Sequence, residues 1–480
     1  MGTEFYQKRR IVPFGIEIFD KCGTMIYRFD WTDQLKMCFL RIFKIRHTQR
    51  KKWGFFMAIT IPFGKSGMPL HADLSKAEIL ESHVGELKAT DTEDGLVLAA
   101  MAHPIDSPRL KELAAGKKTC TIIISDHTRP VPSKHILPAM LAELREGNPK
   151  IDITLLVATG FHRPSTDQEL KDKLGPEIFG KEKIVVHNSR DASSAIQVGV
   201  LPSGAKCVID KVAAQADLLV AEGFIEPHFF AGFSGGRKSI LPGICDQVTV
   251  LGNHCSKFID SRYARTGVLD GNPLHKDMLA AAKLAKLAYI VNVIIDEDKK
   301  VVAAFAGNPV TAHRQGCDLL LKYCQVQPKK RGDIVISSNG GYPLDQNIYQ
   351  SVKGLTAAEA AAAPGGVLIM VSNCGDGHGG ESFYHALKEC TTTKQLAADI
   401  LATPQDKTKP DQWEIQILCR VLNQHHVIYV TDPAQRKTIE EMKMAWAPDV
   451  DTALQEARRI KGQDAHLVVI PNGISVMVRE

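Results

Sequence analysis

Nine short runs of β-branched and aliphatic residues, separated by longer helical stretches, are the feature that most constrains the fold of this chain. Runs of this length are typical of buried strands, and strands that alternate with helices form parallel sheets covered by helices on both faces. We therefore predict an α/β fold with two α/β domains and mostly parallel sheets. The predicted strands are 121–126, 152–160, 183–188, 217–224, 289–296, 333–340, 366–373, 426–432 and 466–473.

A polar segment, "VQPKKRGD" at 326–333, separates the first five runs from the last four and marks a domain boundary. It divides the chain into an N-terminal catalytic and cofactor-binding domain, 57–325, and a C-terminal Rossmann-like α/β domain, 330–480. We expect the active site in the cleft between them, because small-molecule sites are common at domain interfaces. The alanine-rich helix before Pro364 should end at that proline and the glycines after it.

The first 56 residues differ in charge from the rest of the chain. They carry 12 Lys and Arg against 5 Asp and Glu, whereas the remaining 424 residues carry 47 and 49. They show neither the clean apolar core nor the cleavage site of a signal peptide. At Met57 the sequence becomes "MAITIPFGKSGMPLHADL", which is typical of two short strands joined by a turn. Our hypothesis is that 1–56 is a basic leader outside the native protein, which would then start at Met57.

Composition excludes several classes of protein. The net charge of +5 belongs to the leader, so the body has no basic face and we expect no nucleic-acid partner. No apolar run approaches the roughly 18–20 residues that a membrane-spanning helix needs, so we expect no membrane association. The 11 cysteines include no CxxC pair, which is typical of a reduced, cytoplasmic protein.

Polar and charged side chains follow several of the predicted strands at the point where each strand ends. Because open α/β sheets bind ligands at the carboxyl ends of their strands, we expect these side chains to meet at one site. The candidates from both predicted domains are Asp126, His127, Thr128, Arg129, His162, His228, Gln350 and Lys353.

These residue types permit more than one chemistry. Two histidines suit a general acid and a general base, and the cationic Arg129 and Lys353 suit a carboxylate or a phosphate. Each residue also has an ordinary structural interpretation, such as a histidine that bonds a neighbouring carbonyl. Together with His254, the histidines also permit a three-histidine zinc site of a hydrolase. No HxH or HExxH spacing supports zinc, and zinc leaves Lys238 without a role.

The segment "EPHFFAGFSGGRKSILPG" at 226–243 places Lys238 after a glycine pair. A P-loop has the spacing GxxxxGK[ST], and in GFSGGRK the lysine and Ser239 are displaced by one place relative to the second glycine of the motif, Gly236. The motif therefore does not assign Lys238 to a nucleotide γ-phosphate.

Over 57–480 the chain resembles the nickel-pincer lactate racemase family. Five segments carry the resemblance, in the order and spacing of the family: "DHTRP", "TGFHRP", "EPHFFAGFSGGRK", "GNH" and "PLDQNIYQSVKG". The resemblance implies a racemase that interconverts D- and L-lactate or a related 2-hydroxy acid.

The resemblance also implies a cofactor. This is nickel carried by a pyridinium-3,5-bisthiocarboxylate mononucleotide, covalently bound through a thioamide to Lys238. His254 would be the protein ligand to nickel, for which imidazole is a suitable donor. Residues 126–129 would contact the cofactor, and cofactor-maturation proteins would be required as partners.

In the same way, the resemblance implies His162 and His228 as the catalytic acid and base, with Gln350 and Lys353 binding the substrate. The chemistry is consistent with this, because removing the C2 hydrogen of a 2-hydroxy acid as a proton would build a dianion. Removing it as hydride, while a histidine takes the hydroxyl proton, leaves a planar 2-oxo acid. Return of hydride to the opposite face inverts the configuration, so two histidines on opposite sides are needed.

Three alternatives remain open at this point. The first is another 2-hydroxy acid as substrate, such as malate or an aromatic or sugar-derived acid, with Phe229, Phe230 and Tyr349 deciding the preference. The second is a zinc-dependent hydrolase. The third is a binding protein without turnover.

Overall fold

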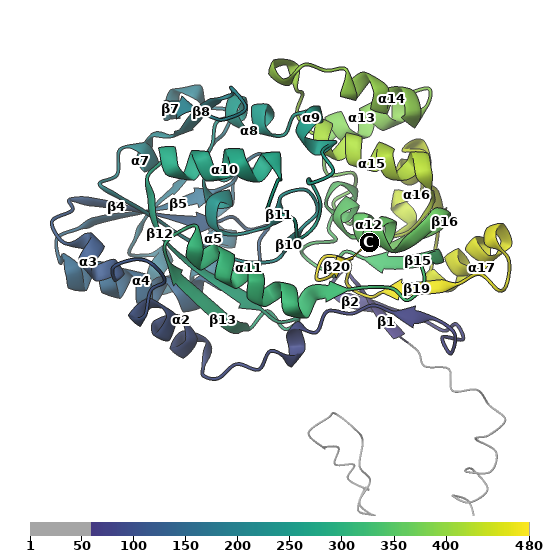
Figure 1. Ribbon diagram of the computed structural model, residues 1–480, viewed down its shortest axis with the longest axis horizontal. Coiled ribbons are helices and arrows are strands. Elements are labelled where there is room, and N and C mark those ends of the chain that lie inside the picture. The colour runs from purple at the N-terminus through teal and green to yellow at the C-terminus, as the bar shows by residue number, and fades with distance from the viewer. Residues whose placement is uncertain (1–58, 480) are drawn as a thin grey trace, which may run out of the picture. The chain divides into compact units, whose positions relative to one another are not determined.

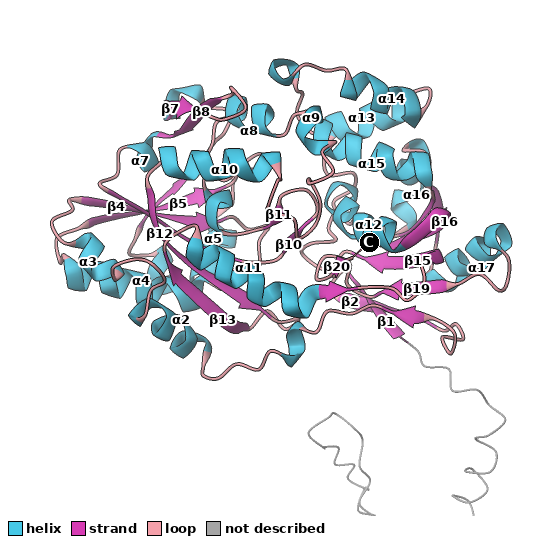
Figure 2. Cartoon of the chain, in the orientation of Figure 1, coloured by secondary structure: helices cyan, strands magenta, loops and turns pink. Residues whose placement is uncertain are grey.

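The computed structural model describes residues 59–479 and contains two six-stranded sheets flanked by helices (Figures 1 and 2). Both sheets are mostly parallel, so the predicted fold class is confirmed. The predictions about the leader and about Met57 concern residues outside this range. No helix within 59–479 is long and apolar enough to cross a membrane.

The first sheet has the strand order β13-β12-β9-β4-β5-β6. Its strands are β4 (Thr119–Ser125), β5 (Asp152–Ala158), β6 (Lys183–Val186), β9 (Leu218–Phe224), β12 (Leu287–Ile295) and β13 (Val301–Gly307). The strands from β12 to β6 are parallel and are the five predicted for this half of the chain. The edge strand β13 was not predicted, and it runs antiparallel to β12.

Helices cover both faces of this sheet because alternate residues of each strand point to opposite faces. Ile122 and Ile124 of β4 pack with α2 (Glu93–Ala102) and α4 (Ser133–Gly147). Ile123, between them, belongs to the core on the other face, together with α10 (Pro273–Leu284). The carboxyl ends of the parallel strands therefore remain accessible at one edge of a covered sheet.

The second sheet has the order β18-β17-β16-β15-β19-β3, and all its strands are parallel. The strands are β3 (Glu78–Ile79), β15 (Gly332–Ser338), β16 (Ala362–Val371), β17 (His426–Val430), β18 (Ala445–Ala447) and β19 (Leu467–Ile470). One face carries α12 (Ile348–Ala361) and α15 (Gln412–Gln424), and the other carries α17 (Val450–Lys461). Helix α12 ends three residues before Pro364, as the sequence predicts.

Residues 59–79 depart from the predicted domain division. The expected strand, turn and strand are present as a hairpin of β1 (Ile59–Phe63) and β2 (Ser66–Leu70). The predicted domain 57–325 includes this segment, but Ile61 and Leu70 pack on the second sheet, and β3 pairs with β19. The reason is that the sheet edge at β19 offers unpaired backbone groups, which β3 satisfies. The boundary near 326–330 stays a prediction.

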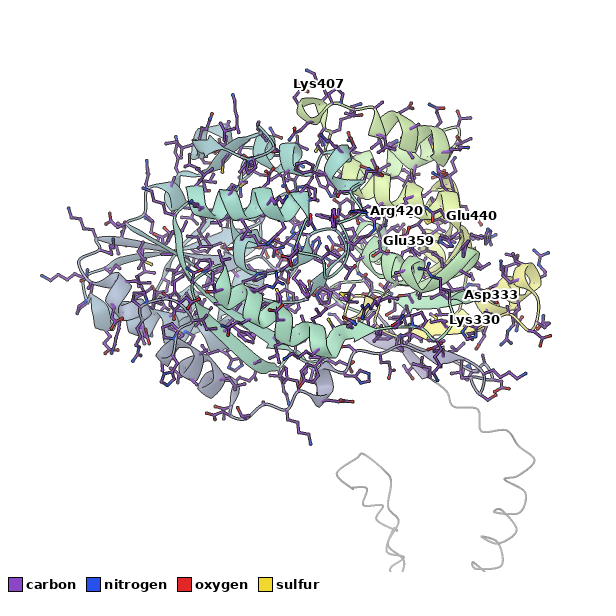
Figure 3. All side chains as sticks on the ribbon, in the orientation of Figure 1. Lys330, Asp333, Glu359, Lys407, Arg420 and Glu440 are labelled. Atoms are coloured by element: carbon purple, nitrogen blue, oxygen red, sulfur yellow. The ribbon has the colours of Figure 1, made fainter. Side chains whose placement is uncertain are left out.

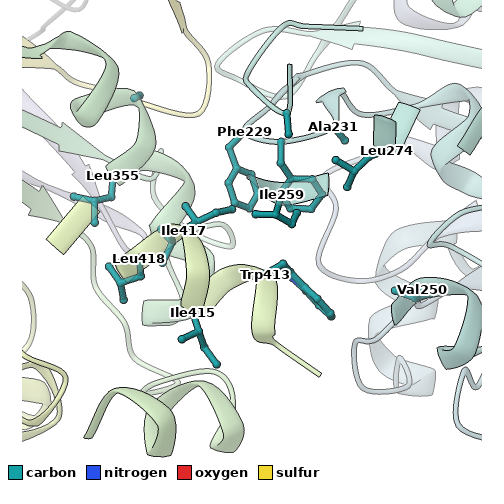
Figure 4. Close-up of a cluster of buried hydrophobic side chains, with 14 of the residues drawn as sticks. Phe229, Ala231, Val250, Ile259, Leu274, Leu355, Trp413, Ile415, Ile417 and Leu418 are labelled. Carbon is teal, nitrogen blue, oxygen red and sulfur yellow. The ribbon is translucent and has the colours of Figure 1, made fainter. Parts of the chain in front are cut away.

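The two halves share one apolar core. Phe229 and Ile259 from the first half lie beside Ile417 of α15 (Figure 4). Hydrogen bonds cross the same interface, including one of 3.0 Å from Nε2 of Gln416 to the carbonyl of Ser256. The shared core holds α12 and α15 against the carboxyl edge of the first sheet. All nine cysteines within 59–479 are free thiols.

Candidate active site

A cavity of about 440 Å³ lies where the carboxyl ends of β4, β5 and β9 face α12 and the start of α15. Parallel strands bring their following loops to one edge, which is why segments far apart in sequence meet there. All ten site residues predicted from the sequence line this cavity. They are Asp126, His127, Thr128, Arg129, His162, His228, Lys238, His254, Gln350 and Lys353.

His162, in the turn after β5, is oriented by a buried carboxylate. Its Nδ1 lies 2.6 Å from Oδ2 of Asp126. Burial tends to raise the pKa of Asp126, but His162, Arg129 and the Thr128 hydroxyl lower that pKa below its ordinary value, so the carboxyl is ionised. An ionised carboxylate only accepts hydrogen bonds, so Nδ1 of His162 donates. In the neutral form of the ring, the lone pair is then on Nε2.

The loop 126–129 is held by its own side chains. The Thr128 hydroxyl donates to Oδ1 of Asp126 at 2.7 Å and accepts from Nη1 of Arg129 at 2.9 Å. His127 turns to the other side, where its Nδ1 lies 3.0 Å from the Ser165 hydroxyl. In this structure Asp126 and Thr128 thus position His162 and Arg129, which is a role that the sequence did not predict for them.

His228 and Lys238 face each other across the loop after β9. Nδ1 of His228 accepts from the backbone N–H of Ala231 at 3.3 Å, so the proton of the neutral ring lies on Nε2. This Nε2 is 3.2 Å from Nζ of Lys238. Burial lowers the pKa of His228 well below its usual value, so the ring is neutral.

The same environment disfavours the charged form of Lys238. Burial is the main cause that lowers the pKa of this amine well below its usual value, followed by the nearby Arg237 and Arg129. A neutral amine has a lone pair that accepts from the Nε2–H of His228. A neutral amine is also nucleophilic, which an ammonium is not.

A buried arginine shapes the loop that presents Lys238. The guanidinium of Arg237 donates to the carbonyls of Phe233 and Ala231 at 2.7 and 2.6 Å. Gly236 has φ of +53°, and a Cβ there would lie 2.7 Å from the His313 ring. The glycines thus allow a tight turn around Arg237 at the first turn of η3 (Gly236–Ser239), which carries the lysine.

His254 follows α8 (Gln247–Asn253) and presents one free ring nitrogen. Its Nδ1 donates to the carbonyl of Val250 at 3.0 Å, which leaves a lone pair on Nε2. Burial lowers the pKa of His254 to about 3, so the ring stays neutral as a metal ligand must. Within residues 59–479 no group of three His, Cys, Asp or Glu side chains is placed to hold a metal ion. The three-histidine zinc site is therefore not formed.

The first turn of α12 brings Gln350 and Lys353 into the cavity. Asn347 caps this helix by accepting from the Gln350 N–H at 2.9 Å, which places both side chains on the cavity side. Nζ of Lys353 donates to Oε1 of Gln350 at 2.8 Å. Burial, and then the charge of Arg129, lower the pKa of Lys353 to about 8.

Trp413 and Glu414 are among the cavity residues that the sequence did not predict. Trp413 and Glu414 lie at the start of α15, and the Trp413 ring packs edgewise on the His254 ring with centroids 4.9 Å apart. Glu414 is 1% exposed, and burial raises its pKa well above the usual value. Neither residue follows a strand, so the strand-end rule missed them. A signal was present in the sequence, because Glu414 is an acidic residue inside the largely apolar helical segment "QWEIQILC".

Two family models match the chain. The model described as the lactate racemase N-terminal domain covers residues 63–267, and the model described as the lactate racemase C-terminal domain covers residues 327–478. Together they span most of the described chain, and the C-terminal model begins at 327, within the polar segment 326–333.

Two similar proteins and one solved structure support the same relationship. A lactate racemase from Thermoanaerobacterium thermosaccharolyticum is 52% identical over 423 residues, which are 88% of this chain and 99% of that protein. A lactate racemase from Lactiplantibacillus plantarum is 50% identical over 424 residues, 88% of this chain and 100% of that protein. The structure of the lactate racemase apoprotein from T. thermosaccharolyticum superposes with a TM-score of 0.84 at 51% identity, covering 88% of this chain and 100% of that one.

A more distant protein from Thermotoga maritima shares the fold alone. Its crystal structure has a TM-score of 0.60 at 18% identity and covers 78% of this chain and 99% of that chain.

Proposed function

The chain belongs to the lactate racemase family and is a racemase-type isomerase, and from that premise we propose that it interconverts D- and L-lactate. The alternative within this class is another 2-hydroxy acid, such as malate or an aromatic or sugar-derived acid. The observation that carries the proposal is the pair of histidines in one cavity, one with a lone pair on Nε2 and the other with a proton on Nε2.

The residues of the cavity fit a lysine-bound nickel nucleotide. Lys238 offers a neutral amine for a covalent bond, and His254 offers a single neutral imidazole nitrogen. Since no protein cluster within 59–479 is suited to a metal ion, nickel held here would bring most of its ligands with its nucleotide. Residues 126–129 at the end of β4 would contact this group. When bound, it supplies an acceptor for the hydride that leaves C2 of the substrate.

The two histidines present different groups on Nε2. Nε2 of His162 is a base, and Asp126 stabilises the positive charge that the ring gains on taking the hydroxyl proton. To return a proton to the oxygen of the planar 2-oxo acid, His228 must first gain a second proton, because a neutral ring that gave up its only proton on Nε2 would become an imidazolate. It then acts as the acid, and the reverse reaction exchanges the two roles. Each direction therefore starts with one neutral histidine and one imidazolium.

Cationic groups hold the carboxylate of the substrate. Lys353 is positively charged below about pH 8, and its Nζ is already oriented by Gln350. Arg129 adds a second positive charge on the same cavity. The walls near His228 are aromatic, with Phe229 and Phe230 in ring contact with it. A small acid with one carboxylate and a short apolar substituent suits this lining.

A substrate panel tests the proposal. The protein is produced together with the proteins that mature the cofactor, and single enantiomers of lactate, malate, mandelate and a sugar-derived acid are followed by polarimetry. We expect lactate to racemise from either enantiomer, and protein made without maturation partners to be inactive. A loaded protein that racemises none of the acids would overturn the proposal and favour a binding protein. Another acid as the preferred substrate would overturn only the choice of lactate.

A further inference from the structure

A second cavity, of about 800 Å³, lies outside the active site and has walls from both halves of the chain. The first half contributes the loop 262–268 before α10. The second half contributes the last turns of α12 and α15 and the strand β20 (Met477–Val478). Five arginines line this cavity: Arg262, Arg265, Arg331, Arg420 and Arg479.

The charges on this wall are unbalanced. Glu359 is the one carboxylate among the described residues that line the cavity. It forms a two-point ion pair with Arg420, with N–O distances of 2.8 and 2.6 Å, and Figure 3 shows the two side chains together. Even without Arg265, the arginines on this wall outnumber its carboxylate, so the wall carries an excess of positive charge. Guanidinium groups bind phosphate and carboxylate through paired hydrogen bonds, so such a wall favours a ligand with several negative charges.

Two contacts connect this cavity to the active site. Phe229 lines both cavities, and its ring stacks on His228 with centroids 5.0 Å apart. Thr356 lines the second cavity, and its hydroxyl donates to the carbonyl of Lys353 at 2.7 Å. Helix α12 thus carries Lys353 into one cavity and Thr356 into the other, one turn apart.

We propose that the arginine cavity binds a compact polyanion, of phosphate or carboxylate type, that links the two halves and alters catalysis in the adjacent site. Arg262 and Arg265 would hold it from the first half, and Arg331, Arg420 and Arg479 from the second. Because binding involves both halves, it stabilises their relative position, and Phe229 and Thr356 transmit that change to a catalytic histidine and to the substrate-binding lysine. The binding does not depend on the proposed reaction.

Binding is tested on the unloaded protein. Pyrophosphate and citrate serve as phosphate-type and carboxylate-type probes, with potassium chloride at matched ionic strength as reference, by calorimetry and thermal unfolding. We expect at least one probe to bind saturably and raise the Tm. The double variant Arg262→Gln/Arg331→Gln should weaken this binding by about tenfold or more. Arg436→Gln, an exposed arginine on α16 (Arg436–Glu441) that does not line the cavity, should leave it unchanged.

The active site is itself cationic, so a second variant locates the binding. Arg129→Gln/Lys353→Gln should retain the saturable binding, because those residues line only the active-site cavity. Binding lost in this variant but kept in Arg262→Gln/Arg331→Gln would overturn the proposal. So would the absence of saturable binding of both probes in the wild type.

Coupling is tested on the loaded enzyme. Addition of the probe that binds should change kcat or KM for racemisation in the wild type, and this change should be absent in Arg262→Gln/Arg331→Gln. Saturable binding without any change in either constant would overturn the coupling. Polyanion binding is measured on protein without the cofactor. Its result can therefore be interpreted even if the protein proves not to be a racemase.

Discussion

Nε2 of His228 lies 3.2 Å from Nζ of Lys238, and the backbone N–H of Ala231 holds the other ring nitrogen as an acceptor. The ring proton is therefore directed at the lysine, which has to be a neutral amine to accept it. One contact thus brings together an amine suited to covalent attachment and the ring of a proposed catalytic histidine. Once the amine is consumed in a covalent bond, Nε2–H of His228 is released for the substrate.

Lys238 of the unloaded protein should react with small electrophiles faster than exposed lysines do. At about pH 7.5 an ordinary lysine is almost fully protonated, and only the neutral amine reacts, so we expect cyanate to carbamylate Lys238 at least about tenfold faster than Lys407. Raising the pH should accelerate Lys407 while changing Lys238 little. Peptide mass spectrometry measures both rates. Equal rates with the same pH dependence would show that Lys238 is an ammonium.

Asp126→Asn should impair racemisation through His162. An amide donates as well as accepts, so it no longer stabilises the imidazolium or fixes its tautomer, and we expect kcat to fall by about 10²–10⁴-fold. The double variant Asp126→Asn/His162→Asn should be no slower than His162→Asn alone, because both act on one proton transfer. Intact mass confirms that each variant carries the cofactor. If the fall in kcat of the double variant equals the product of the falls in the two single variants, Asp126 has a role separate from that of His162.

Substitutions at His254 and Lys238 should separate the metal from the covalent link. His254→Ala removes a neutral nitrogen ligand, so we expect nickel to be lost or loosened while the added mass on the protein remains. Lys238→Ala should lose both the added mass and the nickel. Metal analysis and intact mass report the two properties independently of activity. Added mass that persists in Lys238→Ala would disprove the covalent role of this lysine.

Substrate binding should weaken as the pH rises through about 8. The pKa of Lys353 is lowered to about 8, so the ammonium that attracts the substrate carboxylate is present below that pH and lost above it. We expect KM for lactate to rise between about pH 7 and 9. Lys353→Arg should flatten this rise because a guanidinium stays charged. An identical pH profile in Lys353→Arg would assign the titration to another group.

Gly236→Ala should destabilise the protein and displace Lys238. Alanine at φ of +53° is strained, and its Cβ would lie 2.7 Å from the His313 ring. The left-handed conformation alone costs about 1–2 kcal/mol. Gly85→Ala is the matched control, since no atom lies within 4 Å of a Cβ there. Urea unfolding measures both variants, and equal free energies of unfolding would contradict the steric argument.

Much of the fold was predictable because the relevant signals are local. Each buried strand is a short aliphatic run, and nine such runs appear as strands in the structure. The strand-end residues were predictable for a related reason, since parallel strands bring their carboxyl ends to one edge whatever the connections between them. The edge strand β13 was missed because its alternation, "VVAAFAG", is weak and it pairs antiparallel with its neighbour.

The sequence by itself determined the α/β class, the family resemblance and the residues that gather in the cavity. Strand patterns and motif spacing depend only on the order of residues along the chain. Only the tertiary structure decided how those residues act on one another. Asp126 forms a hydrogen bond with His162, which is 36 residues away in the sequence. Glu414 lies on a helix near the end of the chain and is buried at the cavity wall. Protonation states depend on burial and on charges from distant segments. This burial and these charged neighbours exist only once the two halves of the chain have packed together.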